Sequence, residues 1–301
     1  MSHPVDPSRS MLLAVPKIMP SLNAKSGISE GSSDSPQTVG KGQAPDKLQG
    51  HWILARAGKR VLRPGGLELT RRMLAALAIG PQDRIVEFAP GLGVTARTVL
   101  QHHPSAYWGV EREPVAAEYL RKRLSAYRAE IVLGQAEKSG LPDGCATVVY
   151  GEAILSMQNQ EQKNRIFAEA RRLLSAGGRY AIHELCFLPE DISDSVRHEI
   201  QAAMSREIHA GIQPLSRNEW VRLFERNGLK VAWSCEAPMH LLEPRRMLQD
   251  EGFGGVLRIA FNIATNPLLR HRILGMRRLF RKYGEHLGAI SLVGKRKPEN
   301  A

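Results

Sequence analysis

Apolar segments of two different kinds alternate along residues 67–186, and this alternation limits the possible folds more than any other feature of the chain. Short apolar runs such as 84–88 and 107–110 fit buried strands, whereas apolar positions at helical spacing, as in 161–174, fit amphipathic helices. Strands that alternate with helices of this length pair in parallel and need helices on both faces. We therefore expect an α/β fold whose ligands bind beyond the carboxyl ends of the strands.

The second half of the chain extends this sheet. A capping box at 216–219 predicts a helix that leads into a sixth strand at 230–234. The apolar segment 287–293 predicts a seventh strand, inserted at the edge of the sheet. Two further stretches, about 188–212 and 240–284, are predicted as helical insertions after strands five and six. The expected strands are 84–88, 107–110, 131–133, 146–150, 180–185, 230–234 and 287–293.

Composition sets the domain limits. Residues 1–50 are rich in Ser, Pro, Gly, Lys and Gln, which predicts a disordered tail before one domain over 51–301. The formal net charge of +12 permits contact with nucleic acid, anionic lipid or acidic small molecules and chooses none of them. Three widely spaced cysteines, with no pair at metal spacing, favour a cytoplasmic protein without a structural metal.

The turn after the first strand carries the most specific signal. Gly91 and Gly93 allow the backbone to approach a ligand closely, and a predicted helix follows them. Glu111 lies about 20 residues after Gly91, the spacing at which an acidic side chain can accept hydrogen bonds from ribose hydroxyls. No third glycine follows Gly93, which argues against a dinucleotide. Glu87, before the turn, would repel phosphate and suits a cationic ligand. A tight turn and a solvated glutamate would also explain these residues.

With this turn, the run 86–93 resembles the first motif of class I S-adenosylmethionine-dependent methyltransferases. The segments 109–111, 134–137 and 141–144 resemble later motifs of the same class. The stretch 170–179 resembles the end of this domain in the branch that acts on small molecules and lipids, including quinone and sterol methyltransferases. The resemblance covers about residues 60–187. It implies a Rossmann-like, seven-stranded, mostly parallel sheet with helices on both faces, and S-adenosylmethionine as the methyl donor.

The resemblance also implies which residues bind the donor. Glu87, Ala89 and Gly91 would border its methionine part, Glu111 would hold the ribose, and Gln135 would lie beside the adenine. Three residues depart from the family pattern: Ala89 replaces a glycine, while Gln135 and Thr147 each replace an aspartate. The full set of expected cofactor-binding residues is Glu87, Ala89, Gly91, Gly93, Glu111, Arg112, Gln135, Ala136 and Gly151.

Candidates for catalysis lie where the fourth and fifth strands end. His183 could accept a proton from a phenol or an alcohol during methyl transfer, and Glu152 lies at the end of the fourth strand. Because side chains alternate across a strand, His183 and Glu184 must face opposite sides of the sheet. A structural role for His183 is the competing interpretation.

The second insertion is basic and amphipathic over 256–282. Its apolar face could pack on the domain as a lid while its basic face remains in solvent. The same pattern could instead place the protein on an anionic membrane surface, with a lipid-like substrate.

Three functions follow as alternatives. The first is methyl transfer to a small organic or lipid-like acceptor by in-line displacement, under a lid that excludes water. The second is methylation of RNA or protein; we do not expect nucleic acid as a partner, because the sequence at 150–153 lacks the Asn/Asp-Pro-Pro-aromatic signature of enzymes that methylate base amino groups. The third is a non-catalytic protein that binds S-adenosylmethionine.

Overall fold

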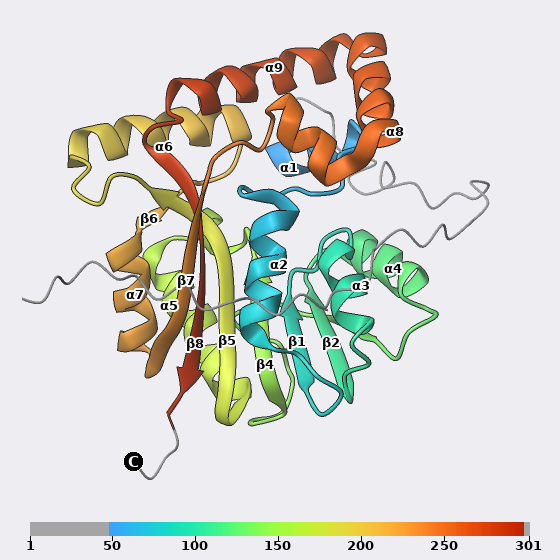
Figure 1. Ribbon diagram of the computed structural model, residues 1–301, viewed down its shortest axis with the longest axis vertical. Coiled ribbons are helices and arrows are strands. Elements are labelled where there is room, and N and C mark those ends of the chain that lie inside the picture. Colours follow the sequence, from blue (N-terminus) through green and yellow to red (C-terminus); the bar gives the residue numbers. More distant parts are fainter. Residues whose placement is uncertain (1–47, 298–301) are drawn as a thin grey trace, which may run out of the picture. The chain divides into compact units, whose positions relative to one another are not determined.

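Eight strands form one sheet in the computed structural model, which describes residues 48–297 (Figure 1). Along its main path the strand order is β3-β2-β1-β4-β5-β8-β7, and the two-residue β6 pairs with β5. Strands β1 to β5 pair in parallel, while β8 runs antiparallel to both of its neighbours. The strands are β1 (Arg84–Phe88), β2 (Ala106–Glu111), β3 (Glu130–Leu133), β4 (Ala146–Glu152), β5 (Leu174–Phe187), β6 (Leu215–Ser216), β7 (Leu229–Pro238) and β8 (Leu287–Arg296).

Helices cover both faces of this sheet and one end of it. The helices are α1 (Gly50–Arg56), α2 (Gly66–Leu77), α3 (Val94–Leu100), α4 (Pro114–Arg123), α5 (Gln160–Leu173), α6 (Asp194–Ile208), α7 (Arg217–Arg226), α8 (Pro244–Thr265) and α9 (Pro267–Lys282), with the short 3-10 turn η2 (Leu155–Met157). The predicted α/β fold, with a mostly parallel sheet and helices on both faces, is confirmed.

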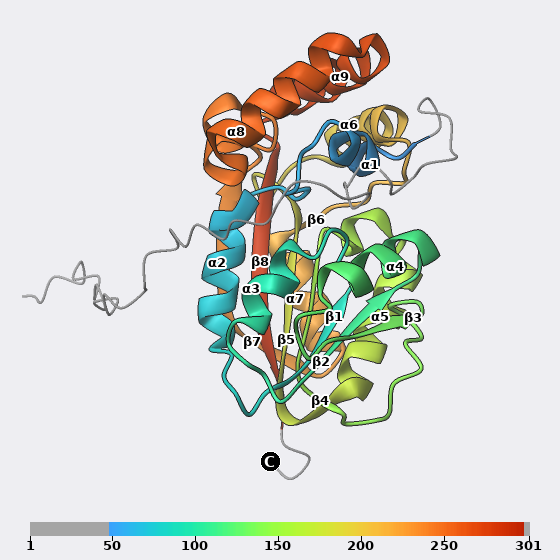
Figure 2. The same ribbon diagram turned by 90° about the vertical axis from the view of Figure 1, so that its right-hand side faces the viewer.

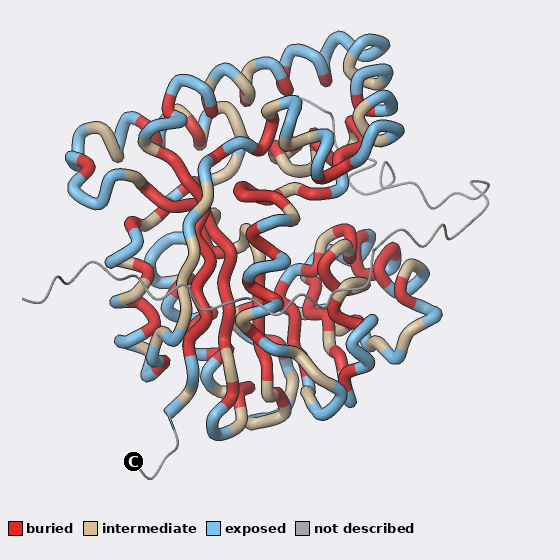
Figure 3. The backbone as a smooth tube through the Cα atoms, viewed as in Figure 1, coloured by how far each residue is buried: buried red, intermediate tan, exposed pale blue. Residues whose placement is uncertain are grey.

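Side chains alternate across the buried strands (Figures 2 and 3) and so divide the core into two layers, one on each face of the sheet. Ile85 points toward α2, α3 and α4, and the neighbouring Val86 points toward α5 and α7. A third hydrophobic cluster joins α1, α6, α8 and α9 beyond the carboxyl end of the sheet. We call these four helices the cap. Since ligands bind at this end of a parallel sheet, the cap covers the place where a site is expected.

Sequence patterns predicted the local structure of the helices well. The capping box at 216–219 begins α7, with the side chains and backbones of Ser216 and Glu219 bonded reciprocally. The insertions predicted at about 188–212 and 240–284 contain α6, and α8 with α9, respectively.

Two predictions need correction. The last strand was placed at the edge of the sheet, but β8 lies between β5 and β7, where its residues 287–293 are buried. The tail was predicted to extend to residue 50, but Leu48 is fully buried and α1 begins at Gly50. Helix α1 packs against α6 and α9, and such long-range contacts leave no periodic signal in a seven-residue helix. The predicted disorder of residues 1–47 falls outside the described residues.

Candidate active site

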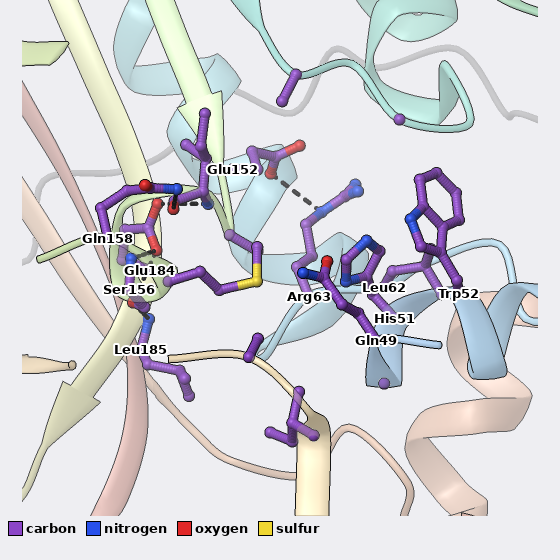
Figure 4. Close-up of a pocket in the computed structure, with 18 of the residues that line it drawn as sticks. Gln49, His51, Trp52, Leu62, Arg63, Glu152, Ser156, Gln158, Glu184 and Leu185 are labelled. Carbon is purple, nitrogen blue, oxygen red and sulfur yellow. Dashed lines mark hydrogen bonds and ion pairs between the residues drawn. The ribbon is translucent and has the colours of Figure 1, made fainter. Parts of the chain in front are cut away.

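A cavity of about 630 Å³ lies between the carboxyl ends of the central strands and the cap. The sheet contributes the polar residues after β1, β2 and β4, and the cap contributes mainly apolar side chains. Figure 4 shows part of this lining, in which segments distant in sequence meet.

The turn after β1 has the backbone conformation that the glycine pattern predicted. Ala89, Gly91 and Gly93 all have positive φ angles, of 51°, 59° and 67°. Ala89 and Gly91 line the cavity, so the methyl group of Ala89 is accommodated in the left-handed conformation at the cost of backbone strain. Gly93 does not line the cavity. It precedes α3, and an added Cβ would lie 3.0 Å from a methyl carbon of Leu120.

Glu87 is a buried carboxyl group at the floor of the cavity. The hydroxyl groups of Tyr107 and Tyr150 each donate to its Oε2, both at 2.5 Å. Burial raises the pKa of Glu87 to about 7, despite these two hydrogen bonds. A cation in the cavity would favour the ionised form of this carboxyl group, and the site is therefore suited to a positively charged ligand.

The expected ribose and adenine residues reach the same cavity. Glu111, at the end of β2, is buried and accepts a hydrogen bond from the backbone N–H of Glu113 at 3.1 Å. Burial raises the pKa of the Glu111 carboxyl group above its usual value. Arg112, Gln135 and Ala136 also line the cavity.

Glu152 is the centre of a dense polar cluster. Its Oε1 atom lies 3.0 Å from Nε of Arg63 and 2.9 Å from Nδ1 of His183, and the hydroxyl of Thr70 donates to it at 2.5 Å. Thr95 donates to Oε2, also at 2.5 Å. Burial alone would raise the pKa of Glu152, but Arg63, His183 and Thr70 outweigh it and lower the pKa to about 2. Glu152 lines the cavity as a carboxylate that is a very weak base.

His183 does not occupy the position predicted for a catalytic base. The side chain is fully buried and lies outside the cavity lining. Its Nε2 lies 2.6 Å from the carbonyl oxygen of Pro64, which can only accept, so Nε2 carries a proton. Its Nδ1 faces Glu152. With both ring nitrogens engaged, His183 supports Glu152 and is not placed to take a proton from an acceptor.

Glu184 and Gly151 also have structural roles. Glu184 faces away from His183, as strand alternation predicts, and its carboxylate accepts from the backbone N–H groups of Ile154, Leu155 and Ser156 at 2.8–2.9 Å. Gly151 does not line the cavity, and an added Cβ would lie 3.2 Å from Ile154.

Two polar residues of the lining escaped the sequence analysis. Nη2 of Arg63 and Nδ1 of His51 are buried atoms without a hydrogen-bond partner among residues 48–297. Burial, together with the charge of Arg112, lowers the pKa of His51 to about 4, so the ring is neutral at pH 7. Figure 4 shows both side chains, with the Arg63–Glu152 ion pair as a dashed line. Neither residue belongs to a motif, because the approach of each to the strand ends depends on the tertiary fold.

The cap side of the cavity is apolar. Met204 and Ile208 come from α6 and its end, and Met276 and Phe280 come from α9. These side chains belong to the cap's hydrophobic cluster. The cavity thus has one half lined by carboxylates and exposed backbone and another lined by thioether, aliphatic and aromatic groups.

Comparisons with known proteins identify the part of the chain that runs from β1 into β5. Residues 85–178 match a family model described as a methyltransferase domain. An uncharacterized protein from Haemophilus influenzae is 29% identical over 217 residues, which cover 71% of this chain and 84% of that protein.

Solved structures share the fold at low sequence identity. A candidate sarcosine dimethylglycine methyltransferase from Galdieria sulphuraria matches with a TM-score of 0.62 and 15% identity, covering 76% of this chain and 84% of that one. Geranyl diphosphate C-methyltransferase from Streptomyces coelicolor, in complex with Mg²⁺, geranyl diphosphate and S-adenosyl-L-homocysteine, matches with a TM-score of 0.54 and 16% identity, covering 76% and 80%. Residues 85–178 therefore form a methyltransferase domain, and its motifs are those of enzymes that use S-adenosylmethionine as methyl donor.

Proposed function

We propose that this protein transfers the methyl group of S-adenosylmethionine to a small, largely apolar acceptor bound beneath the cap. The observation that carries the proposal is the division of one cavity into a polar half at the strand ends and an apolar half under α6 and α9. A donor and an acceptor of different polarity can thus be held side by side. Such positioning supplies much of the rate enhancement in a displacement reaction.

The residues of the polar half fit the donor. The turn at Ala89 and Gly91 exposes backbone to it, and Glu111 offers a carboxylate to its ribose. Glu87 faces the cavity with a carboxyl group that a positive charge would ionise. S-adenosylmethionine, when bound, supplies a methyl group on a positively charged sulfur, which makes that carbon open to nucleophilic attack.

Glu152 would act by holding Arg63 rather than by accepting a proton. Its pKa of about 2 makes it a poor base at pH 7, and four side chains already bond its two oxygens. The ion pair fixes the Arg63 guanidinium, whose Nη2 would then donate to a carboxylate or other oxygen of a bound ligand. The neutral ring of His51 offers a second polar contact of this kind.

The cap would exclude water and select the acceptor. Met276 and Phe280 line the apolar half, so they would contact the acceptor's hydrocarbon part. A dry site strengthens the electrostatic interactions that orient the reacting groups.

The proposal is tested by incubating the full chain with methyl-labelled S-adenosylmethionine and a panel of small apolar acceptors, then extracting the products into organic solvent. We expect label in the organic phase. Phe280→Ala should raise the KM for the acceptor and leave S-adenosylhomocysteine binding unchanged. Leu279→Ala is the matched control, because Leu279 lies on the same helix and does not line the cavity. Label that enters only RNA or protein would contradict the acceptor class, and an equal effect of the two variants would contradict the place assigned to the acceptor.

A further inference from the structure

The outer face of the cap exposes large apolar side chains that do not pack in a hydrophobic core. Eight such side chains are exposed among the described residues, and six of them lie between Leu248 and Leu274. On α8, Phe253, Leu257 and Phe261 are 71%, 55% and 66% exposed. Their spacing of four residues places them on one face of the helix. An exposed apolar stripe of this kind marks a surface that contacts another apolar phase.

Contacts on the opposite face of α8 fix this orientation. Ile259 is buried in the cap, and the side-chain amide of Asn262 donates to the carbonyl oxygen of Ala57 at 3.1 Å. The helix breaks at Gly252, which has a positive φ of 73°, and Phe253 follows directly. Rotation of α8 to bury the stripe would break these contacts. The outward position of the stripe is therefore part of the packed structure.

The segment that contains the stripe is positively charged. Residues 252–284 contain no Asp or Glu, and they contain seven basic residues: Arg258, Arg270, Arg272, Arg277, Arg278, Arg281 and Lys282. Arg281 and Lys282 pair with Glu243 and Glu199. Arg270 and Arg278 are exposed and form no ion pair with any residue in the range 48–297. Their charges are available to an anionic partner.

Helix α9 also closes the cavity. Leu274 and Arg278 lie on the outer face of α9, and Met276 and Phe280 on its inner face line the apolar half of the cavity. In both views α8 and α9 lie at the end of the molecule beyond the strands (Figures 1 and 2). A partner bound to this face would therefore touch the helix that walls the acceptor site.

We propose that the outer face of α8 and α9 docks on the surface of an anionic lipid bilayer. Phe253, Leu257 and Phe261 enter the interfacial region, and Arg270 and Arg278 contact the headgroups. An exposed apolar stripe on α8, followed by unpaired cations on the next helix, matches an anionic interface, in which acyl chains lie beneath negative charge. No helix within residues 48–297 is long and apolar enough to cross a bilayer, so the proposed contact is with its surface.

Co-sedimentation of the full chain with vesicles tests the proposal without any methyl donor or acceptor, so its outcome is independent of the proposed reaction. We expect binding to vesicles of equal phosphatidylcholine and phosphatidylglycerol at low salt, and weaker binding to pure phosphatidylcholine. Phe253→Ser with Phe261→Ser should lower the affinity by about tenfold or more. The control is Val115→Ser, which removes an exposed apolar side chain from α4.

Charge is tested separately. Arg270→Gln with Arg278→Gln should weaken binding to the anionic vesicles by about 30-fold, since each cation near such a surface contributes about 1 kcal/mol. Arg222→Gln with Arg226→Gln on α7 removes two exposed charges elsewhere and should have little effect. No binding at low salt, or equal losses in the test and control variants, would overturn the proposal. A dimer in light scattering that the two serine substitutions dissociate, without vesicle binding, would assign the stripe to a second copy of the chain instead.

Discussion

At the scale of single residues, the carboxyl group of Glu87 gives the most direct link between burial and function. Its pKa is raised from 4.5 to about 7 in the folded state. The folded chain therefore holds a proton that the unfolded chain releases near pH 4.5. Stability contributed by this group is present below pH 4.5 and is lost as the pH rises to about 7. Above pH 7 the folded state is therefore about 3 kcal/mol less stable than it would be if Glu87 titrated as it does in the unfolded chain.

Glu87→Gln removes this pH dependence. Its amide can still accept from Tyr107 and Tyr150, so we expect the variant to match the wild type near pH 4 and to be more stable at pH 8, by up to about 3 kcal/mol. Urea unfolding at several pH values measures the difference in unfolding free energy between the variant and the wild type. The wild type should also bind S-adenosylmethionine more tightly as the pH rises from 6 to 8, and the variant should not. A stability gap that does not change with pH would contradict this account.

The sequence predicted the site residues that lie at the ends of strands. It did not predict the residues that enter the site from other segments of the chain. Glu87 and Glu111 end or nearly end short apolar runs, and a parallel sheet brings such ends together. Arg63 lies before a Pro-Gly-Gly turn with no periodic signal, so its ion pair with Glu152 was not predictable. The place of His183 on the fifth strand was predicted, but its burial beside Pro64 and Glu152, which decides its role, was not.

At the scale of elements, Glu251 of α8 forms hydrogen bonds and ion pairs with the segment that precedes α2. Oε1 of Glu251 accepts from the backbone N–H groups of Arg60 and Val61 at 2.8 and 2.9 Å, and Oε2 lies 3.1 Å from Nε of Arg60. Its Oε1 also lies 3.6 Å from Nζ of the buried Lys59. The carboxylate is buried, so this contact between the cap and the α/β domain is shielded from solvent.

Glu251→Ala should therefore lower the free energy of unfolding by about 3–5 kcal/mol, because it removes the nearer of the two carboxylates beside Lys59 and leaves two backbone N–H groups without an acceptor. Glu285→Ala, which removes an exposed glutamate just after α9, should change it by less than about 0.5 kcal/mol. Urea unfolding compares the two, and limited proteolysis should cut α8 earlier in Glu251→Ala. Similar unfolding free energies for the two variants would show that the cap does not depend on this contact.

Periodicity gave the type of most elements, but not their order in the sheet. The strand at 287–293 was predicted from its apolar run, yet β8 inserts between β5 and β7. Its position depends on pairing with two strands distant in sequence, and an apolar run does not encode a partner. For the same reason residues 48–50, where Leu48 is buried in the cap and α1 begins, were assigned to the tail.

At the scale of the whole molecule, a methyltransferase domain and a helical cap enclose one cavity with two chemically different halves. The sheet end supplies the carboxylates and the strained turn, and the cap supplies the apolar wall. The outer face of the cap adds a basic and apolar surface. These features are the basis of our two proposals, methyl transfer to a largely apolar acceptor and contact with an anionic lipid surface.

Thermal unfolding of the full chain with and without S-adenosylhomocysteine, with NAD as the control ligand, tests the central claim most directly. At about 100 times its dissociation constant a ligand adds about 2.7 kcal/mol to the stability of the folded state. We predict that S-adenosylhomocysteine raises the midpoint by several degrees, that NAD does not, and that Glu111→Ala abolishes the shift. An unchanged midpoint with S-adenosylhomocysteine, or an equal rise with NAD, would contradict the assignment of this cavity to the methyl donor.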